Sequence, residues 1–242
     1  MNDITLILPY YRNPGMLRRQ AEEWAKYPSG MRVIVVDDGS PSDPAHEVLP
    51  EDCRASIYRV NVDIPWNRNG ARNLGSHVAR TEWILHTDID HILPAGNAEW
   101  LCTRRLDPSH WYKFARYRIG RADGTRLKDA IPDDAEYGAI KPHVDSFLCQ
   151  RDLYWRCGGY DEDFSGSIGG SSVFLAHMKK AALCELLEST CLHVFTRDKI
   201  PDASDNGLSR DRSRYERIRA EKAAAGDPKP TRWMRFPWMH VR

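Results

Sequence analysis

Short apolar runs alternate with segments of helical periodicity in the first part of the chain. Runs rich in β-branched and other apolar residues predict buried strands at 4–8, 32–36, 56–60 and 82–86. The intervening segments have apolar residues at helical spacing and predict helices at 14–24, 45–49 and 69–79. Strands and helices that alternate at this spacing predict βαβ units and a mostly parallel sheet.

The second part of the chain has a less regular pattern. Strand-like runs lie at 111–118, 145–149 and 191–195, and a helical period runs through 172–187. Residues 160–170 form an acidic, glycine-rich loop between them. A highly charged helix is predicted at 210–225, and its thin apolar stripe of Tyr215 and Ile218 places it at the surface.

Carboxylates follow two of the predicted strands, at the edge where parallel sheets bind ligands. Asp88-Ile89-Asp90 offers oxygen ligands that suit Mg²⁺ or Mn²⁺, and such an ion would neutralise a diphosphate. Alternatively, Asp88 and Asp90 only cap a turn. Asp38, in Asp37-Asp38-Gly39-Ser40, could accept a hydrogen bond from a uracil or a ribose hydroxyl, or belong to an ordinary turn capped by Ser40.

A third polar segment, 69–75, opens the predicted helix at 69–79. Arg72 could pair with a phosphate or with the aspartates, and Asn73 could bond to either; the alternative for Arg72 is a solvated helix face. The glycines here do not match a dinucleotide-binding motif, and the chain contains no P-loop sequence. Both of those nucleotide-binding classes are therefore disfavoured.

Six ordered blocks of sequence resemble family 2 glycosyltransferases with the GT-A fold. The blocks are 6–11, 35–40, 70–75, 87–90, 145–148 and 158–164. The resemblance implies an α/β fold with a mostly parallel central sheet flanked by helices. It implies a catalytic domain at 1–195, with a nucleotide-binding half at 1–95 and an acceptor half at 96–195. Residues 196–242 would be an appended basic tail.

The resemblance also implies a nucleoside-diphosphate sugar donor, with UDP-sugars favoured, and Mn²⁺ or Mg²⁺ as cofactor. The implied donor-binding residues are Pro9, Tyr11, Asp38, Arg72, Asn73 and Asp88. Asp90 would ligate the metal together with Asp88, and His193 matches a histidine that completes the metal site in some members. The alternative for His193 is a partly buried strand histidine.

The sequence departs from the family where inverting members carry a Glu-Asp pair. It reads Gly169-Gly170-Ser171-Ser172, and a hydroxyl near its free pKa cannot act as general base. Three readings follow: a base among the nearby Asp161, Glu162 and Asp163, a retaining mechanism, or an inactive protein that only binds nucleotide sugars. A sugar-nucleotide pyrophosphorylase ranks last, because the first strand-to-helix loop has no glycine-rich, basic signature.

Composition adds one asymmetry to this picture. The 242 residues carry 35 basic and 34 acidic side chains, but residues 197–242 have twelve basic and seven acidic ones. The basic, aromatic tail could clasp the body through Trp233 and Trp238, bind nucleic acid, or meet a membrane interface. A hydroxymethylated DNA base is therefore retained beside glycans as an acceptor. Scattered cysteines without a paired motif, and the lack of a signal or spanning segment, predict a cytoplasmic protein with reduced thiols.

Overall fold

The computed structural model describes residues 1–121, 139–196 and 212–242. Within these ranges one ten-stranded sheet runs through the molecule in the order β10-β3-β2-β1-β4-β8-β6-β9-β5, and β7 pairs with β6. The strands are β1 Ile4–Tyr10, β2 Met31–Asp37, β3 Ala55–Val60, β4 Trp83–His86, β5 His91–Ile92, β6 His110–Arg121, β7 Ala139–Ile140, β8 Phe147–Gln150, β9 Leu183–Thr196 and β10 Trp238–His240.

The core of the sheet is parallel, as the sequence predicts. β1 pairs in parallel with β2 and β4, and β2 with β3, so these four strands end at one edge. β8 is antiparallel to β4 and to β6, whereas β6 and β9 run parallel. The four predicted strands of the first part of the chain are all confirmed, with bounds that shift by one or two residues.

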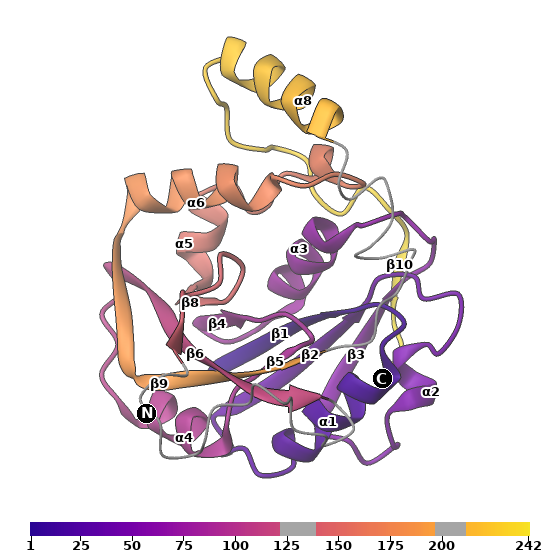
Figure 1. Cartoon of the computed structure of the whole chain (residues 1–242), viewed down its shortest axis with the longest axis vertical. Coiled ribbons are helices and arrows are strands. Elements are labelled where there is room, and N and C mark those ends of the chain that lie inside the picture. Colours follow the sequence, from indigo (N-terminus) through magenta and orange to yellow (C-terminus); the bar gives the residue numbers. More distant parts are fainter. Residues whose placement is uncertain (122–138, 197–211) are drawn as a thin grey trace.

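Helices cover both faces of the sheet (Figure 1). They are α1 Pro14–Trp24, α2 Ala45–Val48, α3 Arg68–Val78, α4 Ala95–Thr103, α5 Arg151–Arg156, the short 3₁₀ helix η2 Glu162–Phe164, α6 Gly170–Ala181 and α8 Arg212–Ala224. Alternate residues of β1 divide between two cores because strand side chains point to opposite faces. Leu6 and Leu8 pack with α1, α2 and α4, whereas Ile7 packs with α3, α5 and α6.

The helix predicted at 172–187 is too long. α6 ends at Ala181, the next residue has extended backbone, and Leu183–Thr196 forms β9. Residues 183–187 pair in parallel with the start of β6, and this sheet pairing overrides the helical spacing of the apolar residues. The predicted strand at 191–195 is the second part of the same long strand.

The C-terminal segment, residues 212–242, packs onto the body of the molecule. The Trp233 indole donates to the carbonyl oxygen of Gly158 at 2.7 Å, and Phe236 is buried against α3. β10 then adds an antiparallel strand beside β3, where the Trp238 ring meets Tyr58. The structure thus shows the packing of Trp233 and Trp238 onto the body that the clasp alternative predicts.

The charged helix is α8, and it touches the body through Ile218, which packs with Phe164 and Val173. No helix among the described residues has the length and apolar character needed to cross a membrane. All six cysteines are free thiols in the structure.

Candidate functional site

Polar side chains at the start of α3 connect the parallel strands to the loop at 158–171. The Asn67 amide donates to Asp38 Oδ1 at 3.1 Å, and its carbonyl oxygen accepts from the Ser165 hydroxyl at 2.8 Å. Asn69 donates to the Asp161 carbonyl oxygen at 3.1 Å. α3 therefore holds the first part of the chain against the second part, at the carboxyl edge of the sheet where ligands bind in such folds.

The two aspartates after β2 have different roles. Both Asp37 oxygens accept backbone N–H groups, from Ser40 and Ala45, at 2.8 Å, so Asp37 builds the turn. Gly39 has φ +76°, and a Cβ there would lie 2.3 Å from the Val62 carbonyl oxygen, so only glycine fits this position. The turn places Asp38 directly after β2, at the carboxyl edge of the sheet.

Asp38 is a buried carboxyl group without a cationic partner among its described contacts. Burial raises its pKa well above the ordinary value, and the charges of Asp37 and Asp63 raise it further, while the bond from Asn67 opposes the shift. A carboxyl group held in this way gains from a ligand that donates a hydrogen bond to it. This property matches the role that the resemblance implies for Asp38.

Tyr11 and Pro9 lie beside this position. Pro9 is half-buried near the end of β1, opposite Val36 of β2. The Tyr11 hydroxyl donates to both carboxylate oxygens of the exposed Asp63 at 3.2 Å. The structure thus brings Pro9, Tyr11 and Asp38 to one end of the carboxyl edge.

Asp88 lies between two basic side chains just after β4. The guanidinium of the fully buried Arg72 donates to Asp88 Oδ1, and His143 Nδ1 lies 3.3 Å from Oδ2. Burial alone would raise the pKa of Asp88, but Arg72 and His143 outweigh it and hold the pKa well below its ordinary value. Asp88 is therefore ionised at neutral pH. Two Arg72 nitrogens, Nε and Nη1, are buried here without a hydrogen-bond partner among the described residues.

One group of donor atoms in the described part of the chain could hold a metal ion. One atom each from Asp88, His91 and His143 lie within 4.8 Å of one another. His91 also bonds to Ser146 through Nδ1 at 2.9 Å, and its Nε2 lies 3.1 Å from Arg116 Nη1. An ion at this position would therefore compete with Arg116 for the imidazole.

The other predicted ligands, Asp90 and His193, are not members of this group. Asp90 is half-buried two residues after Asp88. Burial lowers the pKa values of His91 and Arg116, and the negative charge of Asp90 opposes both shifts. His193 lies on β9, where its electrostatic neighbours are Glu23 and Arg19 of α1. The ligand roles of Asp90 and His193 stay predictions, and the geometry brings Asp88 together with two other histidines.

Ser171 occupies the position where a base was expected. Its hydroxyl oxygen accepts from Arg68 Nη2 at 3.2 Å, while Arg68 Nη1 pairs with Asp145 at 3.0 Å. Asp145 is buried and also accepts from the Tyr160 hydroxyl at 2.8 Å. Burial would raise the pKa of Asp145, but Arg72 and Arg68 outweigh it and lower the pKa. An ionised carboxylate paired in this way is a weak proton acceptor.

The three predicted base candidates are held by other parts of the chain. Glu162 is buried and accepts the backbone N–H of Met234 at 2.6 Å and of Arg235 at 3.1 Å. Asp161 and Asp163 both pair with Lys222 of α8, at 2.7 and 2.6 Å. Their catalytic role stays a prediction, and their observed contacts attach the C-terminal segment to the body.

Asn73 belongs to the same attachment. Its amide nitrogen donates to Glu162 and to the Tyr160 carbonyl oxygen, both at 2.8 Å, and its oxygen accepts from the Tyr154 hydroxyl at 2.7 Å. All the polar atoms of this side chain are satisfied by the protein. Its predicted role in donor binding stays a prediction, and its observed contacts hold it next to the Arg72 that contacts Asp88.

A comparison of the sequence with models of protein families finds a match. The model of "Glycosyl transferase family 2" matches residues 5–160, more than half of the chain. The chain belongs to this family. The matched residues include β1, the Asp38 turn, α3 and the Asp88 segment. A comparison of the sequence with curated proteins finds no match.

Solved structures share the fold of this family 2 chain at low sequence identity. Staphylococcus aureus TarS 1–349 has a TM-score of 0.60 at 15% identity, over 80% of this chain and 60% of its own. The mannosyltransferase PcManGT from Pyrobaculum calidifontis, in complex with GDP-Man and Mn²⁺, has a TM-score of 0.59 at 14% identity, over 95% and 66% of the two chains. GalNAc-T7 with UDP, GalNAc and Mn²⁺ has a TM-score of 0.64 at 11% identity, over 90% and 47%. This family 2 chain thus spans less than two thirds of the length of these structures.

Three residues of the candidate site were not predicted from the sequence. His91 and His143 lie in the possible metal group, and Arg68 connects Asp145 to Ser171. His91 directly follows the Asp88-Ile89-Asp90 motif, so its position was a usable signal. His143 is more than fifty residues away along the chain, and only the folded sheet brings it to Asp88.

Proposed function

We propose that the protein is a metal-dependent glycosyltransferase that moves a sugar from a nucleoside-diphosphate sugar to an acceptor. The observation that carries the proposal is the placement of Asp38 and Asp88 at one carboxyl edge, in a chain of family 2. Asp38 and Tyr11 would receive the base and ribose, and Asp88 would lie at the diphosphate. A UDP-sugar is favoured as donor, because Asp38 can accept a hydrogen bond from the N3–H of uracil.

The donor atoms around Asp88 support Mn²⁺ as the ion. Asp88 would supply a carboxylate, and His91 and His143 would supply imidazoles. Magnesium prefers oxygen ligands in strict octahedral geometry, whereas a mixed set with imidazole suits transition metals better. Bound there, the ion would stabilise the charge that develops on the leaving diphosphate. Asp90 would hold the same ion from the neighbouring turn.

Buried basic groups would assist in the same step. Arg72 Nε and Nη1, which have no hydrogen-bond partner among the described residues, would donate to the diphosphate oxygens. Arg72 also fixes the direction of the Asp88 carboxylate through their ion pair. The chain would thus supply both fixed cations and metal ligands at the leaving group.

The Asp90→Ala variant tests this proposal. We expect it to abolish Mn²⁺-dependent release of nucleotide from UDP-, GDP- and TDP-sugars, measured as free nucleoside diphosphate. Asp152→Ala, which removes an exposed carboxylate on α5, is the matched control and should retain full turnover. Undiminished metal-dependent turnover in Asp90→Ala would contradict the proposal.

A second candidate function is binding of nucleotide sugars without catalysis. It is favoured by Ser171 in the expected base position and by the engagement of Asp161, Glu162 and Asp163 with the chain's own groups. A protein of this kind would be stabilised against heat by UDP-sugar and Mn²⁺ but would neither transfer nor hydrolyse the donor. Parallel measurements of the melting temperature and of released nucleotide separate the two functions.

The acceptor side of the proposal rests on fewer contacts. The basic residues of the C-terminal segment are consistent with a nucleic-acid acceptor such as a hydroxymethylated base, but Trp233 and Phe236 are used to dock that segment. A glycan acceptor is therefore favoured over nucleic acid. Transfer assays with oligosaccharides and with hydroxymethylated DNA decide between the two classes.

A further inference from the structure

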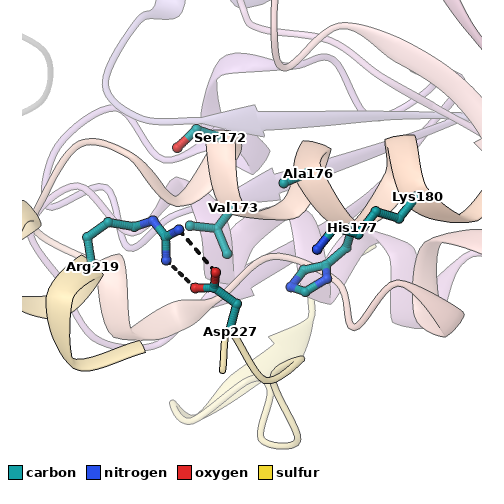
Figure 2. Close-up of a pocket in the computed structure, with 7 residues that line it drawn as sticks. All are labelled: Ser172, Val173, Ala176, His177, Lys180, Arg219 and Asp227. Atoms are coloured by element: carbon teal, nitrogen blue, oxygen red, sulfur yellow. Dashed lines mark hydrogen bonds and ion pairs between the residues drawn. The ribbon is translucent and has the colours of Figure 1, made fainter. Parts of the chain in front are cut away.

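A cavity of 180 Å³ lies where α6 faces α8 and the turn that follows α8. Figure 2 shows its lining: Ser172, Val173, Ala176, His177, Lys180, Arg219 and Asp227. None of these residues belongs to the group around Asp88. The volume is below the roughly 300–1,000 Å³ of pockets that enclose drug-sized ligands, so the cavity suits a small chemical group.

His177 provides a buried polar atom that the protein leaves unsatisfied. The side chain is only 8% exposed, and its Nε2 has no hydrogen-bond partner among the described residues. Its ring lies on the cavity side of α6, toward Asp227 (Figure 2). Because nearly all buried polar groups in proteins are hydrogen-bonded, an unpaired nitrogen at the wall of a cavity indicates a missing partner.

The charges around this nitrogen are mainly positive. Arg219 and Asp227 form a two-pronged ion pair, with Arg219 Nη2 at 3.3 Å from Asp227 Oδ2, and so largely neutralise each other. Lys180 forms no ion pair with any described residue. The positive charge of Lys229 is a further electrostatic neighbour of His177. Burial lowers the pKa of His177, and the charges of Lys229 and Lys180 lower it further, while Asp227 opposes them.

We propose that this cavity binds a phosphate group. The Lys180 ammonium and a His177 N–H would donate to the phosphate oxygens, and charge-assisted bonds of this kind are the strong ones. The Arg219–Asp227 pair would close the opposite wall, where Asp227 is already satisfied by its arginine. Val173 and Ala176 add apolar side chains to the lining, and the carbon skeleton of a small sugar phosphate would pack against them. The site is independent of the sugar transfer proposed above.

Binding of inorganic phosphate to the full chain, measured by calorimetry, tests the site directly. We expect Lys180→Ala to weaken binding by about tenfold, in line with the loss of one charge-assisted hydrogen bond. Lys179→Ala is the matched control, because it removes an exposed neighbouring charge that does not line the cavity, and it should weaken binding by less than about twofold. Both lysines are exposed, so both variants should fold.

Proton NMR of the histidines gives a second readout. When phosphate binds, the pKa of His177 should rise, because an anion beside the ring favours the imidazolium. His46 on α2 lies at the opposite end of the molecule from α8 (Figure 1) and should not respond. Equal loss of binding in the two lysine variants, or an unchanged His177 pKa in saturating phosphate, would overturn the proposal.

Glucose 6-phosphate and glucose distinguish the source of the phosphate. Tighter binding of glucose 6-phosphate than of inorganic phosphate would support a phosphate carried by a sugar, and equal affinities would support free phosphate. Binding of glucose with the same affinity as glucose 6-phosphate would overturn a phosphate site, as would failure of both phosphate compounds to bind.

Discussion

Two groups of carboxylates, each expected to do chemistry, differ in where their partners come from. The strand-end carboxylates, Asp88 and Asp90, follow β4, and Asp88 meets the side chains of Arg72 and His143. The loop carboxylates are Asp161, Glu162 and Asp163. They meet backbone N–H groups and basic side chains of the C-terminal segment.

This difference separates a ligand site from a structural attachment. A histidine such as His143 can exchange a carboxylate neighbour for a metal ion, and two nitrogens of the buried Arg72 have no hydrogen-bond partner among the described residues and could donate to an anion. The close partners of Glu162 are two backbone N–H groups of a packed segment and the buried Asn73 amide, and groups fixed in this way are not readily replaced by a ligand. An acidic motif is thus functional or structural according to whether its partners can be replaced by a ligand.

We expect the largest effect from Glu162→Ala, which should lower the free energy of unfolding. This change leaves Asn73 and the N–H groups of Met234 and Arg235 without their acceptor in a buried position. Removing one member of such a buried charged network costs about 3–5 kcal/mol. Urea denaturation should show this loss, while turnover per folded molecule should stay within about threefold of the wild type, since Glu162 would not take part in chemistry.

Glu216→Ala is the matched control, because Glu216 is exposed on α8, the helix that pairs with the same loop. We expect a change within about 0.5 kcal/mol. A Glu162→Ala protein that keeps full stability but loses turnover would reverse the comparison and make Glu162 the general base.

Asp38 is a third case beside the two groups, because it has no cationic partner among its described contacts. We expect Asp38→Asn to weaken UDP-sugar binding by about 10- to 100-fold, the effect of losing a hydrogen bond to a charged or strongly polar acceptor. The same change should raise the free energy of unfolding at neutral pH. Because burial raises the folded-state pKa of Asp38, ionisation in the unfolded state favours unfolding as the pH rises.

Calorimetry of donor binding and urea denaturation measure the two effects of Asp38→Asn. The stability gain should be absent below the ordinary carboxyl pKa of 3.8 and should grow as the pH rises toward the folded-state pKa. Asp43→Asn, on the exposed part of the same turn, should change neither quantity. Unchanged donor affinity in Asp38→Asn would show that this carboxylate does not contact the base.

Much of the fold was predictable because the parallel strands have strong local patterns. Apolar runs such as 4–8 followed by polar turns identify buried strands, and the sheet order of the first part of the chain follows from βαβ connections. The boundary between α6 and β9 was not, because residues 183–187 have helical spacing and become a strand only through pairing with β6. β10 has three exposed residues and exists through its pairing with β3.

The candidate site was predictable where motif and fold coincide. Asp38 and Asp88 follow strands, so their place at the carboxyl edge follows from the sheet. His143 could not be assigned, because the antiparallel return of β8 beside β4 brings it to Asp88. The structural role of Glu162 depends on a partner more than seventy residues later, Met234, and no local pattern reports such a contact.

Lys113 offers a smaller test of the strand-end group. Its buried ammonium donates to the carbonyl oxygens of His143 and Val144, both at 2.7 Å, and so fixes the backbone that carries the histidine. Lys113→Met should weaken Mn²⁺ binding by about fivefold, because supporting contacts around a metal ligand usually carry a tenfold effect or more and this one acts through the backbone. Lys141→Met, an exposed change in the same segment, is the control.

Burial lowers the pKa of Lys113 to about 8, so the ammonium loses its proton within an accessible pH range. Loss of this proton weakens the hydrogen bonds that hold the backbone of His143. In the wild type, Mn²⁺ affinity should therefore stop rising, or fall, above pH 8. In Lys113→Met this change near pH 8 should be absent. Electron paramagnetic resonance of Mn²⁺ across the pH range measures it. Identical pH profiles in the two proteins would separate Lys113 from the metal group.

The smallest expected effect comes from Asp163, the outermost of the loop carboxylates. It pairs with Lys222 and Arg235 at 2.6 Å, but its side chain is 44% exposed, so solvent screens both pairs. Asp163→Asn should cost less than about 1 kcal/mol of unfolding free energy, and the cost should vanish in high salt.

Burial would raise the pKa of Asp163, but Lys222 and Arg235 lower it overall. The stabilisation is therefore present above pH 3.8 and is lost as the pH falls through the lowered folded-state value. Urea denaturation of both proteins at low and high salt checks this. A loss as large as that of Glu162→Ala would mean that the attachment depends on its exposed ion pairs and not on the buried carboxylate at its centre.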